Sequence, residues 1–155
     1  MLAPSLILLV LTAEPVELFR IERSKNANVV VYEATALEAK EPVKASWILL
    51  AGSGRRESLS FFEKVAAYGF EVRLADDGAS AVLKLKALKG RELTVVKRGG
   101  RLAAIGLIDG EEAVLERVFV TTDERGAVPS VKSIELFGVD ARSGAPLSEK
   151  IVAGK

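Results

Sequence analysis

The sequence predicts a mainly β protein: an antiparallel meander that forms a closed or nearly closed barrel of about 8-10 strands, with one short helix. Most apolar residues fall in short runs, and several runs alternate with polar residues at the period of two that is typical of strands. Glycine-containing turns separate the runs, and one segment carries helix signals. Sheets of this size close on themselves or split, so a two-layer β-sandwich is the alternative.

Residues 1-13 are predicted to be a signal peptide. Their apolar run LILLVL is too short for a bilayer, which needs about 20 apolar residues, but it suits the apolar core of a secretory signal. Residues 14-155 then form a single β-barrel-like domain, exported to the periplasm or the extracellular space, with no transmembrane segment in the mature chain. The alternative is a cytoplasmic protein in which the run forms a buried first strand.

Three predicted strands begin the domain. Residues 19–22 alternate between apolar and charged side chains, as in a half-buried strand. VVVY at 29–32 is apolar on both faces, as in a strand covered on both sides, and SWILLA at 46–51 has the same character. Trp47, the only tryptophan, is therefore expected to be a core anchor that positions the loop after it. Its replacement by alanine is expected to cost about 3 to 5 kcal/mol of stability.

One helix is expected at SFFEKVAAYG, residues 60–69. Ser60 and Glu63 have the spacing of a capping box, and Gly69 is a natural stop. Phe61 and Phe62 give the helix an apolar side, so we expect it to plug one end of the barrel or to pack on a sheet.

The second half of the chain predicts a meander of about six strands. FEVRLA at 70–75 and AVLKLKAL at 81–88 alternate between apolar and polar residues. Further short apolar runs follow, and a glycine turn stands at 89–90, 98–101, 109–110, 124–126 and 143–144. Strands joined by such short turns are antiparallel neighbours.

Composition argues against an enzyme. The 155 residues include no cysteine and no histidine, which excludes thiolate nucleophiles and zinc–cysteine sites and removes the commonest general base. No spacing pairs two carboxylates for acid–base chemistry, so no catalytic residue, metal site or cofactor is predicted. The net charge of +1 draws the chain to no polyanion, and basic residues are not interleaved with aromatic ones, so we expect no nucleic-acid partner.

Two polar loops are candidate ligand-binding segments. Residues 24–28, SKNAN, form a polar knot, and residues 51–56, AGSGRR, offer backbone amides and two arginines to an anion. A hairpin turn and a mobile polar loop are the respective alternatives. If the loops meet at the barrel mouth, the ligand-binding residues are Lys25, Asn26, Asn28, Arg55 and Arg56.

Charge is distributed in blocks. Residues 84–101 are strongly basic and residues 109–124 strongly acidic. In one interpretation the blocks pair across adjacent strands and fix their register. In the other, the basic hairpin binds an anionic surface, such as lipid headgroups or an acidic envelope polymer, through Lys84, Lys86, Arg98 and Arg101.

Three segments carry a family resemblance: LFRIERSKNANVVVYEA, EPVKASWILLAGSGRRESLSFFEKVAAYGF and SVKSIELFGVDARSGAPLSEKIV. They resemble a family of small bacterial proteins, often with signal peptides, that is described as domain of unknown function 4833. The resemblance covers most of the chain after residue 17, and the I-E-R-S-x-N-A-N-x-V block is among its most specific parts. It implies bacterial export, but no activity and no catalytic residues. Because the block includes residues 24–28, it strengthens the case for a site there.

Two classes of function follow. The first is an exported, non-catalytic binding module for a small or anionic ligand. The second is a structural or interaction protein of the cell envelope that acts through the basic hairpin at 84-101. A pocket of several hundred Å³ favours the first, and a filled core with a flat basic face favours the second.

Overall fold

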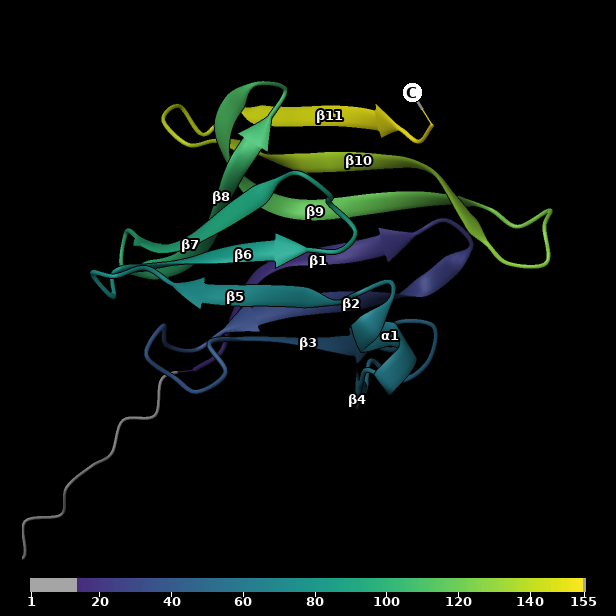
Figure 1. Ribbon diagram of the computed structural model, residues 1–155, viewed down its shortest axis with the longest axis horizontal. Helices are drawn as coiled ribbons and strands as arrows, with labels where there is room; N and C mark the ends of the chain where they lie inside the picture. Colours follow the sequence, from purple (N-terminus) through teal and green to yellow (C-terminus); the bar gives the residue numbers. More distant parts are fainter. Residues whose placement is uncertain (1–13, 155) are drawn as a thin grey trace, which may run out of the picture.

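The computed structural model describes residues 14–154 and contains one sheet of eleven strands and one helix (Figure 1). The elements are β1 (Val16–Arg23), β2 (Asn26–Ala34), β3 (Val43–Ile48), β4 (Arg56–Ser58), α1 (Phe61–Val65), β5 (Phe70–Leu74), β6 (Ser80–Leu85), β7 (Glu92–Arg98), β8 (Arg101–Ile108), β9 (Glu111–Asp123), β10 (Ser130–Asp140) and β11 (Pro146–Val152). The mainly β class with one short helix is therefore confirmed.

The strands run in the order β4-β3-β2-β1-β9-β8-β7-β6-β5, with β10 on the other edge of β9 and β11 beyond it. This path curls strongly into a half-barrel, and the described strands do not form a fully closed barrel (Figure 1). The meander from β6 to β11 is antiparallel, as its short turns predict.

One pairing departs from a purely antiparallel sheet. β1 lies parallel to the second half of β9, with residues 20–23 beside residues 117–120. The first half of β9, residues 111–114, pairs with β8 on that same edge. Turn signals report only sequential neighbours, and β1 and β9 are separated by most of the chain, so no local pattern predicts this contact.

The inside of the half-barrel is filled by side chains. Tyr32 stacks on Phe19 with ring centroids 4.7 Å apart and meets Phe70 edge-on at 5.6 Å. Its hydroxyl donates to the Tyr68 carbonyl at 2.9 Å, and burial raises the Tyr32 pKa well above its ordinary value. Val29 to Tyr32 are all buried, which confirms a strand covered on both faces. Among residues 14–154, the inner face of the sheet is therefore a packed core.

The helix α1 has the expected cap but not the expected packing. The Ser60 amide donates to the Glu63 carboxylate at 2.6 Å, and the Glu63 amide donates to the Ser60 hydroxyl at 3.3 Å. The helix buries no residue, and Phe61 and Phe62 are 73% and 79% exposed. The expectation that its apolar side plugs the barrel is wrong: Leu59, two residues before the helix, and Tyr68, three residues after it, enter the core instead.

The turns follow the glycine pattern with one exception. Gly99 and Gly100, between β7 and β8, have φ of 55° and 79°, where a side chain would be strained. The connection between β9 and β10 has no glycine of positive φ among its described residues, so the expected tight reversal at 124–126 is instead a longer loop. The predicted signal peptide, residues 1–13, lies outside the described residues.

Candidate functional site

The polar knot at residues 24–28 is the turn between β1 and β2. Lys25 adopts a positive φ of 62°. The Ser24 amide donates to the Val120 carbonyl at 2.9 Å, and its hydroxyl accepts the Thr122 amide at 3.0 Å, which ties the turn to β9. Asn26 Oδ1 accepts a backbone amide two residues on at 3.0 Å. These bonds give Ser24 and Asn26 roles within the turn, and a ligand-binding role for Lys25, Asn26 and Asn28 stays a prediction.

Asn28 joins the knot to the 51–56 loop. Its Oδ1 accepts the amide of Ala51 at 3.1 Å. Arg56 makes two bonds of 2.8 Å to the Glu33 carboxylate, and Arg55 pairs with the carboxylate two residues on. Both guanidinium groups therefore already face carboxylates, and anion binding at this loop also stays a prediction.

The basic hairpin does not form a single face. Lys84 pairs with Glu92 at 3.0 Å, and Lys86 donates to the last carbonyl of α1. Arg98 and Arg101 lie at the opposite end of β7, where Arg98 donates to a carbonyl after β10. No ion pair within residues 14–154 joins the basic block to the acidic block at 109–124. Binding of an anionic surface by this hairpin stays a prediction.

Trp47 lies partly buried against the core. Its ring meets Tyr68 edge-on, with centroids 5.3 Å apart. The indole N–H donates to Glu63 at 3.1 Å, so Trp47 joins β3 to the cap of α1. The strand ends at Ile48, and the loop to β4 follows at once.

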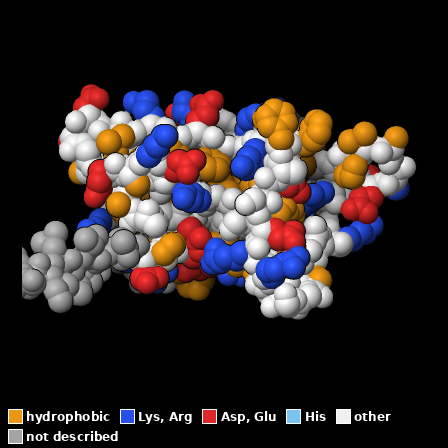
Figure 2. All heavy atoms as spheres, turned by 90° about the horizontal axis from the view of Figure 1, so that it is seen from below, with side chains coloured by type: hydrophobic (Ala, Val, Ile, Leu, Met, Phe, Trp, Pro, Cys, Tyr) orange, Lys and Arg blue, Asp and Glu red, His pale blue; other side chains and the backbone are white. Residues whose placement is uncertain are grey.

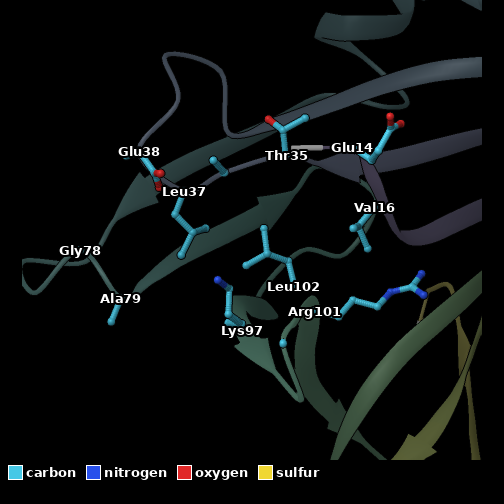
Figure 3. Close-up of a pocket in the computed structure, with 12 residues that line it drawn as sticks. Glu14, Val16, Thr35, Leu37, Glu38, Gly78, Ala79, Lys97, Arg101 and Leu102 are labelled. Atoms are coloured by element: carbon cyan, nitrogen blue, oxygen red, sulfur yellow. The ribbon is translucent and has the colours of Figure 1, made fainter. Parts of the chain in front are cut away.

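A hollow of about 600 Å³ lies at the end of the half-barrel where β1 begins (Figure 3). Figure 3 shows the Lys97 ammonium directed toward Leu37, whereas Arg101 points away from that side chain. Charges of both signs line the hollow, so it does not select an anion. Its charged residues are Glu14, Glu38, Lys97 and Arg101, and its large apolar residues are Val16, Leu37 and Leu102.

A larger groove, of about 690 Å³, lies near the other end of β1. Its size falls within the roughly 300–1,000 Å³ that is typical of small-molecule sites. Six parts of the chain build it, namely the ends of β1 and β9, the segment after α1, the β6–β7 turn, and the outer strands β10 and β11. The apolar side chains that line it include Ile21, Tyr68, Leu88, Val120, Ile134 and Ile151.

The charges that line the groove have one sign. Arg23, Lys86, Lys89 and Arg91 line it, and no carboxylate does among the residues that the structure describes there. Arg91 is neutralised by Glu149 on β11, with Nη1 and Oε2 2.7 Å apart. The other three cations make no ion pair within residues 14–154. Among the described residues, an anionic group at this rim therefore meets three cations that make no ion pair.

Hydrogen bonds fix the walls of the groove. Arg23 donates to the buried Tyr68 hydroxyl at 3.3 Å, which holds the guanidinium beside the apolar floor. Arg91 also donates to a β8 carbonyl at 3.2 Å, so the Arg91–Glu149 pair ties the β6–β7 turn to β11. The Arg91 guanidinium lowers the Glu149 pKa, and a hydrogen bond of 2.9 Å from the backbone amide of Asp109 to the Glu149 carboxylate adds to this effect. Lys89 is exposed and makes no such contact, which leaves its ammonium available to a ligand.

The groove combines two properties that suit an amphipathic anion. The apolar floor takes hydrocarbon out of water, and rim cations pair with a carboxylate, phosphate or sulfate. Sequence reasoning named Lys86 only as part of a flat surface and missed Arg23 and Lys89 as site residues. The one local signal was the Lys89–Gly90 turn, which says where the chain reverses but not what lies opposite.

Neither a metal centre nor a membrane-spanning helix is found in the described part of the chain. Residues 14–154 contain no cluster of three or more His, Cys, Asp or Glu side chains placed to hold a metal ion. Among the helices described there, none has the length and apolar character needed to cross a bilayer.

Comparison with known proteins identifies one family. No curated protein matches the chain, and no solved structure matches it. The family described as Domain of unknown function (DUF4833) matches residues 19–150 and so covers most of the 155 residues. This match includes nine of the eleven strands in full and the greater part of β1 and β11, and with them most of the groove walls. The chain therefore belongs to the DUF4833 family.

Proposed function

We propose that this protein is a non-catalytic binding module that takes an amphipathic anion into the groove between β1, the β6–β7 turn and β11. The ligand class is an alkyl or acyl chain that ends in a carboxylate, phosphate or sulfate. The observation that supports it most is the coincidence of an apolar floor with rim cations that have no carboxylate beside them in the groove lining. The hollow in Figure 3 has no such bias of charge.

The two parts of the ligand contribute differently. Each methylene that is fully buried on the floor contributes about 0.8 kcal/mol, or about fourfold in affinity. The headgroup pairs with Lys89 and Arg23, and Arg23 is positioned for this by the Tyr68 hydroxyl. No acid–base pair lines the groove, and the chain has no cysteine or histidine, so we assign no reaction to the site.

Isothermal titration with octyl, decyl and dodecyl phosphate, each below its micelle concentration, tests the proposal. We expect affinity to rise with chain length, and dodecanol to bind more weakly than dodecyl phosphate because it lacks the charge. Lys89→Glu and Arg23→Gln should each weaken phosphate binding by about tenfold while the response to dodecanol stays unchanged.

Lys40→Glu is the matched control, because Lys40 is exposed in the loop between β2 and β3 and does not line the groove. It changes the net charge as Lys89→Glu does and should leave the affinity unchanged. If the two variants weaken dodecyl phosphate binding equally, the groove is not the site. If no alkyl phosphate binds at millimolar concentration, the proposal is wrong.

We also propose that the protein is exported. The LILLVL run and the resemblance of the chain to bacterial proteins with signal peptides support this location. N-terminal sequencing of the protein from its native host should return a residue near Glu14, and recovery of Met1 would contradict export by cleavage.

A further inference from the structure

The helix α1 exposes large apolar side chains on the protein surface. Phe61 is 73% exposed, Phe62 79% and Val65 43%, and the two phenylalanine rings meet edge-on with centroids 6.1 Å apart. A five-residue helix that buries none of its residues contributes little to the core. The usual explanation for a surface helix, an apolar side turned inward, therefore does not apply to α1.

A second apolar projection comes from the loop between β9 and β10. Val128 is 78% exposed at this loop, and Val131 at the start of β10 is 46% exposed. Figure 2 shows hydrophobic side chains projecting at α1 and at this loop, both along the upper border of that view. The two projections therefore face the same side of the molecule.

The groove opens between the two projections. Ala66 and Ala67, which follow α1, line one side of it, and residues 129–131, which follow the loop, line another. Lys86 and Lys89 lie at its rim, and Lys64 is exposed on α1 itself. The exposed apolar side chains of Phe61 and Phe62 on α1 and of Val128 in the β9–β10 loop, called the apolar tips below, thus flank a cationic opening.

The carboxylates on these elements offset part of that charge. Asp123 pairs with Arg125, whereas Glu63 accepts hydrogen bonds from two neutral donors, the Ser60 amide and the Trp47 indole, and so keeps its negative charge. Glu124 is exposed and makes no ion pair within residues 14–154. The three lysines of the helix and the rim, Lys64, Lys86 and Lys89, therefore exceed Glu63 and Glu124 by one positive charge.

We propose that this face docks on an anionic lipid bilayer, with the phenylalanines of α1 and Val128 inserted among the headgroups and the groove open toward the lipid. A bilayer accepts separate apolar tips, because headgroups fill the space between them, whereas a protein partner needs a contiguous apolar centre. Each lysine near an anionic surface strengthens binding by about fivefold. The inference goes beyond the proposed function and does not depend on it: the two share the rim lysines, but docking alone uses the apolar side chains of α1 and the β9–β10 loop, and ligand binding alone uses the floor.

The cysteine-free chain allows a direct test with single-cysteine variants that carry an environment-sensitive fluorophore. Phe62→Cys and Val128→Cys place the label on the two tips, and Leu74→Cys is the control, since Leu74 is 43% exposed at the far end of β5. With vesicles of phosphatidylglycerol and phosphatidylcholine, labels on the tips should shift to the blue and the control label should not. All variants share residues 1–13, so membrane attachment by that segment alone would not shift the emission of the labels on the tips more than that of the control label.

Cosedimentation supplies the second readout. The double variant Phe61→Ser/Phe62→Ser should lower vesicle affinity by about tenfold or more, and raised salt should weaken the wild type. Circular dichroism checks that the variant folds, and its dodecyl phosphate affinity should be unchanged, which separates this inference from the groove ligand. Equal blue shifts at all three labels, or none, would overturn docking by this face. So would dimers in sedimentation without lipid that the double variant abolishes, because the tips would then join two copies of the chain.

Discussion

Removal of the Trp47 indole tests how the core is linked to α1. The ring packs edge-on against Tyr68, and its N–H donates to Glu63, which also caps the helix. Trp47→Ala therefore removes an aromatic contact and a hydrogen bond to a carboxylate at the same time. Trp47→Phe keeps most of the aromatic contact and removes only the bond.

The structure lowers the cost expected for a fully buried aromatic residue. Full truncation costs about 3 to 5 kcal/mol, but the Trp47 side chain is only partly buried. The aromatic contact contributes about 1 kcal/mol, and the bond to the partly exposed carboxylate about another 1 after allowance for solvent. With the remaining buried area, we expect Trp47→Ala to cost about 2 to 3 kcal/mol and Trp47→Phe about 1 kcal/mol.

Urea unfolding followed by circular dichroism measures both variants, because the only fluorescent indole is lost. Phe62→Ala is the matched control: its ring is 79% exposed, so its unfolding free energy should change by less than about 0.5 kcal/mol. If Trp47→Ala costs no more than this control, Trp47 does not anchor the core. In the wild type, emission from Trp47 should be only partly accessible to an added quencher.

Three further outcomes are expected. Gly138→Ala should destabilise by about 1 to 3 kcal/mol in urea, because a Cβ there would lie 2.1 Å from a β9 carbonyl, whereas Gly52→Ala, with its nearest contact at 3.8 Å, should be neutral. The folded-state pKa of Glu149 is lowered, so its contribution to stability is present above the ordinary value of 4.5 and is lost as pH falls through the folded value. Glu149→Gln should therefore flatten the acid side of the profile of unfolding free energy against pH, and an unchanged profile would contradict the role of the pair with Arg91. Tyr32→Phe should cost about 1 to 2 kcal/mol in the same urea assay, since it leaves a buried carbonyl without its donor, and a neutral result would show that water replaces the hydroxyl.

Local features of the fold were predictable from local sequence. Alternation at 81–86 placed Leu83 and Leu85 in the core and Lys84 outside, and the glycine turns of the meander fall where strands reverse. The capping box at Ser60 was likewise visible, because its partners stand three residues apart. The exposure of α1 was not, since it depends on how far the strands close without the helix.

The candidate site was far less predictable because it depends on distant contacts. Arg56 looked like a free cation in its loop, but it pairs with Glu33, 23 residues earlier and two strands away. Arg23 looked like part of a polar turn, but it lies at the groove because Tyr68 accepts its bond. The sequence shows which charged residues a loop contains, but only the three-dimensional structure shows which of them form ion pairs.

The branching of β9 provides a physical reason for the groove. β8 follows β9 only over residues 111–114, and β1 takes the same edge from residue 117. Beyond that point the hairpin strands no longer cover the inner side of β9 and β10, so apolar residues such as Val120 and Ile134 face a gap that the β6–β7 turn spans only in part. That turn carries Lys86 and Lys89 to the same gap. The parallel pairing of β1 with β9, which no local sequence pattern predicts, thus creates the apolar floor of the groove. The antiparallel meander, which the turn pattern does predict, supplies the cations of its rim.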